Sequence, residues 1–222
     1  MPTPTDEATI EALREHETTT ISDALDFLGL PGATYGIRPL WACGRLAGRA
    51  RTVAVAPREP DTAVTKHLAT AAIASAEPGD VMVMANNGRL DVSCWGGIVT
   101  HASRARGING VVVDGACRDI DGSAELGFPV FGRATVAISA RGRIVEESHQ
   151  TPVTFAGVTV SPGDYVLADN CGVVFVPKDK IGEVLRLAAL IVEREDGMVE
   201  AVKAGTSVVD VMHDTQFQAI VQ

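Results

Sequence analysis

The sequence from residue 107 to residue 119, Gly-Ile-Asn-Gly-Val-Val-Val-Asp-Gly-Ala-Cys-Arg-Asp, decides how this chain is expected to fold. Its centre, 110–113, is apolar and rich in β-branched side chains, which is typical of a buried strand. Helix-like segments flank it over 97–106 and 121–126, and a short strand follows at 129–131. Helices and strands that alternate in this way predict a parallel βαβ layer, and therefore an α/β protein.

The segments on either side extend this layer. Residues 48–56 alternate as a strand does, and helical character resumes over 61–76. After Gly142 the sequence becomes strand-rich, which predicts β-hairpins packed on the layer. No linker interrupts the chain, so we expect one domain over 1–222, with N-terminal helices at about 6–30, a β/α core at about 45–177 and a C-terminal helix at about 180–204.

One short pattern occurs twice. Pro-Gly-Asp at 78–80 leads into an apolar strand and then the loop 85–88, and Pro-Gly-Asp at 162–164 leads into a strand and the loop 169–172. Each loop contains Asn and closes on Gly. We expect two similar hairpin-type elements within one sheet system.

Composition excludes several classes of protein. The 222 residues carry 28 acidic and 19 basic side chains and a net charge of -9, which disfavours a nucleic-acid binder. No apolar run approaches the roughly 18 residues of a membrane span, and the start has no signal-peptide pattern. The four cysteines occur singly, without a disulfide framework or a zinc-binding pair. We expect a cytoplasmic protein that binds neither nucleic acid nor membrane.

Arg118 and Asp119 belong to the densest polar grouping in the sequence, and this grouping lies at the carboxyl end of the strand at 110–113. In open α/β sheets, ligands collect beyond the carboxyl ends of the strands. An Arg can hold a carboxylate through two hydrogen bonds, and an Asp can bind a hard divalent cation. An Arg–Asp pair that merely caps the helix at 121 is an equally good interpretation.

Gly96 and Gly97 open the helix at 97–106 and form a second candidate site. Glycines here bring the first backbone N–H groups close to an anion, which a helix N-terminus attracts. A glycine turn that only lets the helix pack tightly is at least as good an interpretation. His101, on the first turns of this helix, is either an acid–base group or, more often for such a residue, a solvated histidine.

Glu195 is an exception within the last helix. It lies on the apolar stripe at i, i+3, i+4 spacing, whereas Glu193 and Glu200 do not. A carboxylate on an apolar face needs a partner or must leave the core. Glu195 either reaches the site of a neighbouring subunit or marks where the helix becomes exposed.

Taken together, these motifs resemble the RraA-like family. The resemblance covers about residues 20–205 and rests on Gly48–Val53, the two Pro-Gly-Asp turns, Trp95-Gly96-Gly97, Gly107–Gly115 with Arg118 and Asp119, Gly127–Phe131, Asp169 and Gly172. This family includes the 4-hydroxy-4-methyl-2-oxoglutarate / 4-carboxy-4-hydroxy-2-oxoadipate aldolases. It also includes the regulator of ribonuclease E activity, which inhibits by binding protein.

The resemblance implies a swivelling β/β/α domain that forms a homotrimer or a hexamer with active sites between subunits. It implies a lyase that depends on a divalent metal, Mg²⁺ or Mn²⁺, releases pyruvate from a 4-hydroxy-2-oxo diacid and also decarboxylates oxaloacetate. Matched by motif, Asp119 is the metal ligand and Arg118 contacts the substrate. The backbone amides of Gly97, Ile98 and Val99 match the loop that receives the substrate carboxylate, and Glu195 matches the acidic residue of the adjacent subunit.

One departure from the family pattern concerns Gly97. Aldolases of the family can carry an Asp at this position, and Asp91 or Asn87, although not at the matching place, are the candidates to compensate. Arg141 is the candidate for the basic residue that follows the family's next strand. Two alternatives therefore stay open: a non-enzymatic regulator of ribonuclease activity, and a metal-dependent lyase or hydrolase that acts on a different oxo acid.

Overall fold

The computed structural model describes residues 4–60 and 67–212. Within them, the helices are α1 Pro4–Glu15, α2 Thr18–Phe27, α3 Thr70–Ala74, α4 Gly97–Arg106, α5 Ile120–Glu125, α6 Ile181–Lys203 and α7 Val208–Val211. The strands are β1 Arg38–Pro39, β2 Leu46–Pro57, β3 Asp80–Trp95, β4 Gly110–Cys117, β5 Val130–Gly132, β6 Ala134–Thr135, β7 Ile144–His149, β8 Val153–Phe155, β9 Val158–Val160, β10 Tyr165–Asp169 and β11 Gly172–Val176.

The main sheet has the strand order β1-β5-β4-β3-β2-β10-β11, with β6 beside β4 and β7 beside β2. Strands β2, β3, β4 and β5 are parallel neighbours, as the sequence predicts for a βαβ layer. Every residue of β4 is buried, which is typical of a parallel strand covered on both faces.

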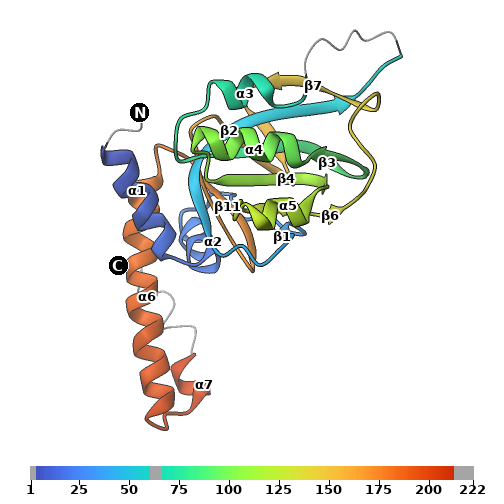
Figure 1. Ribbon diagram of the computed structural model, residues 1–222. Helices are drawn as coiled ribbons and strands as arrows, with labels where there is room; N and C mark the ends of the chain where they lie inside the picture. Colours follow the sequence, from blue (N-terminus) through green and yellow to red (C-terminus); the bar gives the residue numbers. More distant parts are fainter. Residues whose placement is uncertain (1–3, 61–66, 213–222) are drawn as a thin grey trace.

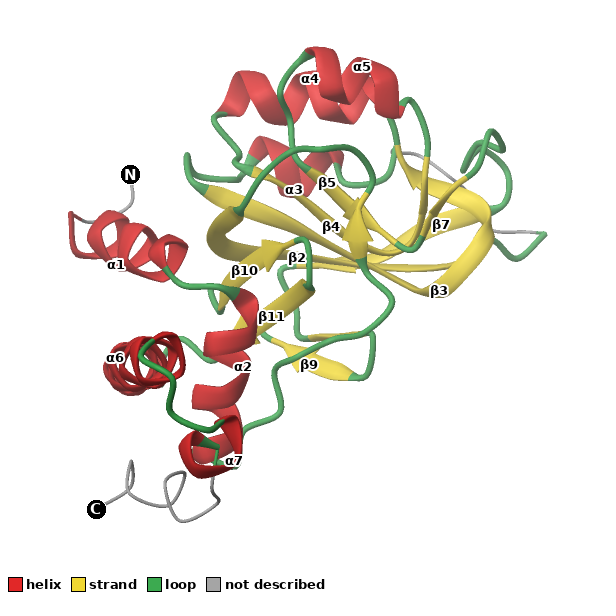
Figure 2. Ribbon diagram, turned by 90° about the horizontal axis from the view of Figure 1, so that it is seen from below, coloured by secondary structure: helices red, strands yellow, loops and turns green. Residues whose placement is uncertain are grey.

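This sheet is the middle one of three layers. Figures 1 and 2 show α3, α4 and α5 on one face, and the β8–β9 hairpin lies on the other. One apolar cluster fills the space under the three helices and a second fills the space under the hairpin. The layers therefore run hairpin, sheet, helices, which confirms the expected β/β/α class.

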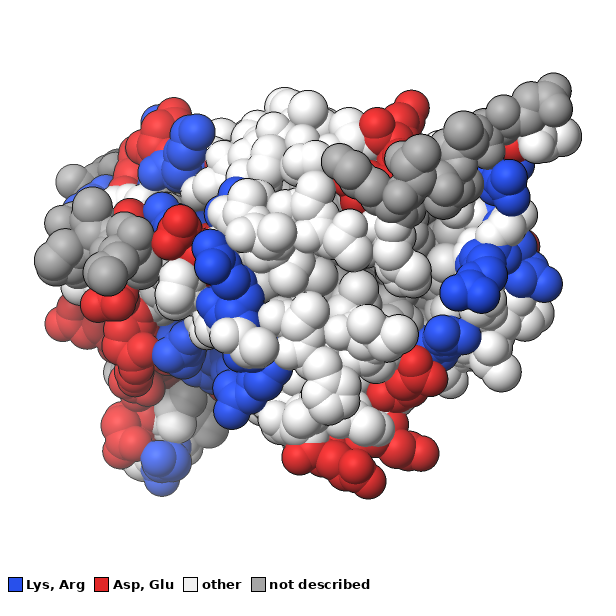
Figure 3. Space-filling view, turned by 45° about the horizontal axis from the view of Figure 1, so that its top comes forward, with Lys and Arg blue, Asp and Glu red and all other residues white. Residues whose placement is uncertain are grey.

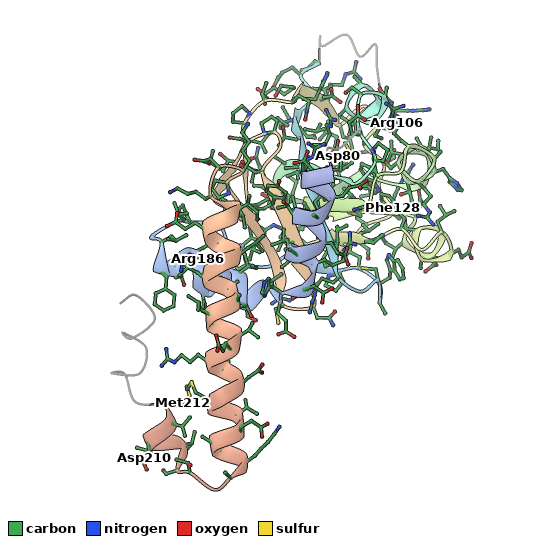
Figure 4. All side chains as sticks on the ribbon, turned by 90° about the vertical axis from the view of Figure 1, so that its left-hand side faces the viewer. Asp80, Arg106, Phe128, Arg186, Asp210 and Met212 are labelled. Atoms are coloured by element: carbon green, nitrogen blue, oxygen red, sulfur yellow. The ribbon has the colours of Figure 1, made fainter. Side chains whose placement is uncertain are left out.

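Helices α1, α2 and α6 cover the β10–β11 side of the sheet. The first half of α6 buries Val184, Leu187, Ala188 and Ile191 in a third apolar cluster. Its second half projects beyond the domain toward α7, and Figure 4 shows Met212 and Asp210 at this far end. The expected long C-terminal helix is thus present, although only half of it is packed. No helix among the described residues is long and apolar enough to cross a bilayer.

Several expected boundaries were wrong. The strand predicted at 110–113 continues to Cys117, because the whole segment pairs with β3. Of the helix predicted at 61–76, residues 61–66 lie outside the described residues, and within 67–76 only Thr70–Ala74, α3, is helical. The strand-rich region after Gly142 only partly forms hairpins on the layer: β7 and β10 pair with β2 and so extend the main sheet itself.

The two Pro-Gly-Asp turns each contain the same type of hydrogen bond, from a backbone N–H to the Asp carboxylate three residues later. The N–H of Glu77 donates to Asp80 Oδ2 at 2.9 Å, and that of Ser161 donates to Asp164 Oδ2 at 2.8 Å. Only the second turn opens a hairpin, β10–β11. After the first turn, β3 runs parallel to both neighbours and absorbs the loop 85–88 as an irregularity in its register with β4, so the hairpin prediction was wrong there.

Asp169 joins the start of α2 to the β10–β11 turn. Its carboxylate accepts hydrogen bonds from Thr18 N at 2.8 Å, Thr18 Oγ1 at 2.7 Å and Cys171 N at 2.8 Å. Burial raises the pKa of Asp169, but the hydrogen bonds from Thr18, Cys171 and Gly172 together hold that pKa below its usual value. The carboxylate therefore stabilises the fold in its charged form.

We expect Asp169→Asn to lower the free energy of unfolding by about 1 kcal/mol at pH 7. A depressed folded-state pKa stabilises above the unfolded value of about 3.9 and ceases to do so as pH falls through the folded value. The gap between wild type and variant should therefore narrow below about pH 4. Urea unfolding at pH 7 and pH 3 measures it, with the exposed Asp179→Asn as control. A gap of equal size at both pH values would contradict this role.

Candidate active site

The carboxyl ends of β3 and β4 create the candidate site. Trp95, the last residue of β3, lies opposite Cys117, the last residue of β4, and Arg118 N donates to Trp95 O at 3.0 Å. From this edge the chain continues through Gly96 into α4 and through Asp119 into α5. Parallel pairing thus brings together the two candidate sites that the sequence places 22 residues apart.

Asp119 lies against the start of α4. Its Oδ2 accepts a hydrogen bond from Gly97 N at 2.8 Å, and Arg118 Nε lies 3.4 Å from the same oxygen. The Asp119 backbone adopts the left-handed region, with φ 58°, and its side chain makes no cap hydrogen bond to α5. The interpretation as a cap of its own helix is therefore wrong for the carboxylate, which caps the neighbouring helix instead.

The first amides of α4 form an anion-binding end. The first backbone hydrogen bond of this helix runs from Thr100 N to Gly96 O, at 3.1 Å. The N–H groups of Gly97, Ile98 and Val99 therefore have no acceptor within the helix. The side chain of Ile98 is 83% exposed. In this chain the anion at Gly97 is Asp119 itself, so an incoming carboxylate shares this helix end with Asp119 or displaces it.

Two clefts meet at Arg118. The first has a volume of about 390 Å³ and is lined by His67, Leu68, Ser93, Cys94, Trp95, Gly96, Gly97, Ile98, Val99, Arg118, Ser139, Ala140 and Arg141. The second, of about 630 Å³, is lined by Leu40, Arg118, Asp119, Ile120, Asp121, Thr135, Val136 and Ala137. The guanidinium of Arg118 and the carboxylate of Asp119, 39% and 48% exposed, are therefore accessible to a small ligand.

Arg141, the candidate for the family's basic residue, lines the same cleft as Arg118. Arg143 Nη1 donates to Arg141 O at 3.3 Å, and Arg58 N donates to Arg143 O at 2.9 Å, so the three arginines are neighbours. Figure 3 shows Lys and Arg side chains on both sides of a largely uncharged area of the surface. The first cleft is lined by two arginines, Arg118 and Arg141, although the whole chain carries a net charge of -9.

Two polar residues of the first cleft, His67 and Ser139, were not among the candidates from the sequence. His67 comes from the segment before α3 and Ser139 from the connection between β6 and β7. Neither belongs to a motif, and only the folded chain brings them to the ends of β3 and β4.

Other candidates lie elsewhere. Asp91 pairs with Arg89 at 2.8 Å, and among the described residues Asp91, Asn87 and His101 line neither of the two clefts. His101 is exposed, in keeping with a solvated helix histidine. None of these three residues therefore takes the place of the Asp that family members can carry at position 97.

Glu195 is not brought to Asp119 within one chain. It lies on α6, on the side of the sheet opposite the ends of β3 and β4. There Glu195 is exposed and lines a cavity of about 650 Å³ with Ile191 and Val199, so within one chain it lies where the helix becomes exposed, one of the two alternatives for this residue. Burial, then the charge of Asp23, raises the pKa of Glu195. Glu200 instead pairs with Lys203 at 2.8 Å.

The donor set fits one kind of metal ion. Within the described residues, no three His, Cys, Asp or Glu side chains form a ready-made cage. Mg²⁺ is usually held by one or two carboxylates, with water and substrate oxygens completing its shell. The half-exposed Asp119 carboxylate, at a cleft that also contains Asp121, matches that requirement and not that of a zinc site.

A family model described as RraA-like, Aldolase/RraA, matches residues 18–175. The chain belongs to the RraA-like family. A proposed 4-hydroxy-4-methyl-2-oxoglutarate aldolase of Halalkalibacterium halodurans is 39% identical to it over 81% of either chain. The RraA-like chain is also 33% identical to protein DlpA of Legionella pneumophila, over 87% of this chain but only 31% of DlpA, so it spans about a third of that relative.

A solved structure shows the same RraA-like fold. Streptomyces coelicolor RraAS2, described as an unusual member of the RNase ES inhibitor RraA protein family, superposes with a TM-score of 0.79. It is 28% identical and covers 90% of this chain and 97% of its own. The family resemblance and the fold expected from the motifs are both confirmed.

Gly96 is the position where added bulk should disturb this RraA-like site. Its φ of -166° suits any residue, but a Cβ there would lie 2.9 Å from Asp119 Oδ2 and 3.2 Å from Arg118 Cγ. We expect Gly96→Ala to push the carboxylate away from Gly97 N–H and to cost about 1 kcal/mol. Urea unfolding gives the free energy, and the amide proton shift of Gly97 reports the hydrogen bond.

Gly97→Ala is the matched variant, since its Cβ would lie 3.4 Å from Asp119 Oδ2, in ordinary contact. Ala favours a helix over Gly by up to about 1 kcal/mol, so this variant should be at least as stable as wild type. The steric account would be wrong if Gly96→Ala left both the stability and the Gly97 amide shift unchanged.

Proposed function

We propose that this protein is a divalent-metal-dependent aldolase that cleaves a 4-hydroxy-2-oxo diacid to release pyruvate, with oxaloacetate decarboxylation as a side activity. The observation that carries the proposal is the convergence of Arg118, Asp119 and the α4 amides at one edge of the sheet. The name of the Halalkalibacterium relative supports this class of reaction.

The first cleft suits a small diacid. Its two arginines, Arg118 and Arg141, come from different connections and offer charge to two separate carboxylates. The amides of Ile98 and Val99 at the start of α4 add hydrogen bonds for an anion. Trp95 is buried beside them and gives the cleft a rigid wall.

Asp119 would hold the ion, which we propose to be Mg²⁺ or Mn²⁺. When bound, such an ion acts as a Lewis acid toward the keto and carboxylate oxygens of the substrate. Asp119 bonds to Gly97 N–H in this structure. A carboxylate that turns from Gly97 toward a cation frees that amide for the substrate carboxylate, so cation and substrate should bind cooperatively.

The reaction breaks the C–C bond next to the alcohol. A base removes the hydroxyl proton, the bond's electron pair moves onto the keto oxygen of the departing pyruvate fragment, and protonation of its carbon gives pyruvate. Arg118 offsets the charge that develops on oxygen. Loss of CO₂ from oxaloacetate produces the same pyruvate enolate. It needs no base, because no hydroxyl proton has to be removed, so one site serves both reactions.

We assign the removal of this proton to Glu195 of the partner subunit, whose carboxylate acts through a polarised water, in a homotrimer or hexamer. Its raised pKa makes this carboxylate a stronger base than an ordinary Glu. The apolar stripe around it supports the assignment, since Val199 and Val202 are half-exposed on the projecting half of α6. This half is available to another copy of the chain.

Asp119→Asn should lower pyruvate release by about 100-fold and weaken Mg²⁺ dependence, because the amide cannot supply the ligand charge. A coupled pyruvate assay with branched 4-hydroxy-2-oxo diacids and with oxaloacetate, each run with Mg²⁺ and with chelator, measures the effect. Glu125→Gln, an exposed carboxylate on the same helix α5, is the control and should keep wild-type rates. Full chelator-sensitive activity in Asp119→Asn would refute the assignment.

A mixing experiment tests the shared site. Asp119→Ala and Glu195→Gln should each be impaired in diacid cleavage, and equal mixing with subunit exchange should restore about a quarter of the sites in a cyclic assembly. Glu195→Gln alone should keep most oxaloacetate decarboxylation, which needs no base. If mixing recovers nothing while subunits demonstrably exchange, Glu195 does not act across an interface.

A second candidate is a non-enzymatic regulator of ribonuclease activity. The likeness to RraAS2 and the glycine in place of the family's Asp at position 97 favour it. Such a protein would keep the Arg118–Asp119 pair and act through its surface. Chelator-sensitive turnover of any oxo acid favours the enzyme, and a substrate outside the branched diacids would point to the third alternative, a lyase or hydrolase with a different oxo acid.

A further inference from the structure

Two buried hydroxyls lie behind the candidate site. Thr100 in α4 and Ser123 in α5 are both 0% exposed. Each lies four residues after the N-cap residue of its helix, which is Gly96 for α4 and Asp119 for α5. Gly96 and Asp119 lead into the two parts of the candidate site, the α4 amides and the Asp119 carboxylate. The two hydroxyls therefore lie one helical turn behind these parts.

Each hydroxyl bonds to the carbonyl at the start of its own helix. Thr100 Oγ1 donates to Gly96 O at 3.0 Å, and Ser123 Oγ donates to Asp119 O at 3.2 Å. The backbone N–H groups of the same two residues donate to the same carbonyls, at 3.1 and 3.2 Å. Each carbonyl is therefore held by two donors, which restrains the first turn of each helix.

The two helices are also joined to each other. Thr100 Oγ1 and Ser123 Oγ lie 3.4 Å apart, and Trp95 Nε1 donates to Thr100 Oγ1 at 2.9 Å. Thr100 gives its single proton to Gly96 O, so its lone pairs accept the Trp95 N–H and the Ser123 hydroxyl, whose proton is shared between Thr100 Oγ1 and Asp119 O. The indole of Trp95 stacks on Phe128, with ring centroids 6.3 Å apart, and this fixes the donor.

We propose that Thr100 and Ser123 are positioning residues: their buried hydroxyl bridge sets the separation between the α4 amides and Asp119. The proposal rests on the proposed function for its catalytic consequence. A carboxylate that must turn between Gly97 N–H and a cation needs its backbone held still, since a misplacement of about 1 Å can cost a factor of about 100. The bridge supplies that restraint from below, where no ligand reaches.

The same helix provides a matched control. Ser103 is also 0% exposed on α4, and its Oγ has no hydrogen-bond partner among the described residues. Removing this hydroxyl tests what the loss of a buried polar atom from α4 does by itself. Removing the Thr100 hydroxyl adds the loss of the bridge.

The experiment compares Thr100→Val, Thr100→Ser, Ser123→Ala and Ser103→Ala. Thr100→Val keeps the volume and removes the hydroxyl, so we expect kcat for pyruvate release to fall about 10–100-fold and Mn²⁺ affinity, by calorimetry, about 10-fold. Thr100→Ser keeps the hydroxyl and should restore both. Ser103→Ala should change neither. Ser123→Ala leaves Trp95 N–H paired and should show a smaller loss of the same kind, so it carries the test if Thr100→Val does not fold.

Equal effects of Thr100→Val and Ser103→Ala, or failure of Thr100→Ser to restore Mn²⁺ affinity, would overturn the bridge. If wild type releases no pyruvate from any oxo acid, the proposed function is wrong, whatever the result for the hydroxyl bridge. Mn²⁺ affinity and the Gly97 amide shift then still decide the bridge: a shift that moves in Thr100→Val and returns in Thr100→Ser supports it, and an unmoved shift refutes it.

Discussion

The parallel pairing of β3 with β4 is the constraint on which the site depends. Both strands end at one edge of the sheet, and the N–H of Arg118 bonds to Trp95 O just beyond their ends. The two connections into α4 and α5 therefore start side by side. Gly96 has no side chain between them, so Asp119 can reach an amide of α4. The geometry comes from backbone pairing, and long flexible side chains contribute little to it.

The charge of the site differs from that of the whole chain. The net charge of -9 suggests poor affinity for an anionic substrate. Arg118, Arg141 and the positive end of the α4 dipole nevertheless meet around one cleft. Asp119 partly neutralises this region in the structure, and under the proposed function a bound cation reverses that. Local arrangement, rather than net charge, decides which ligand this end of the molecule attracts.

The sequence predicts the elements from 97 to 131 well, because their periodicity and glycines are local signals. It offers Arg118, Asp119 and the glycines of α4 as candidate site residues, but it does not predict that Asp119 bonds to Gly97, since that contact depends on the register of two strands. His67 and Ser139 give no signal because loops deliver them. The repeated Pro-Gly-Asp turn shows the same limit: its hydrogen bond is local and recurs, whereas the direction of the strand that follows is set by the partners available to it.

The place of α6 limits what one chain can do alone. Its 23 residues span about 35 Å, and the packed half is held by Val184, Leu187, Ala188 and Ile191. Burying each of the larger side chains contributes about 1.5–3 kcal/mol, so no swing of the helix that abandons them would bring Glu195 to Asp119 of its own chain. Under the proposed function, a base from α6 must then come from another copy. Cleavage of an alcohol needs that base and loss of CO₂ does not, so under the proposed function only the aldol reaction depends on assembly.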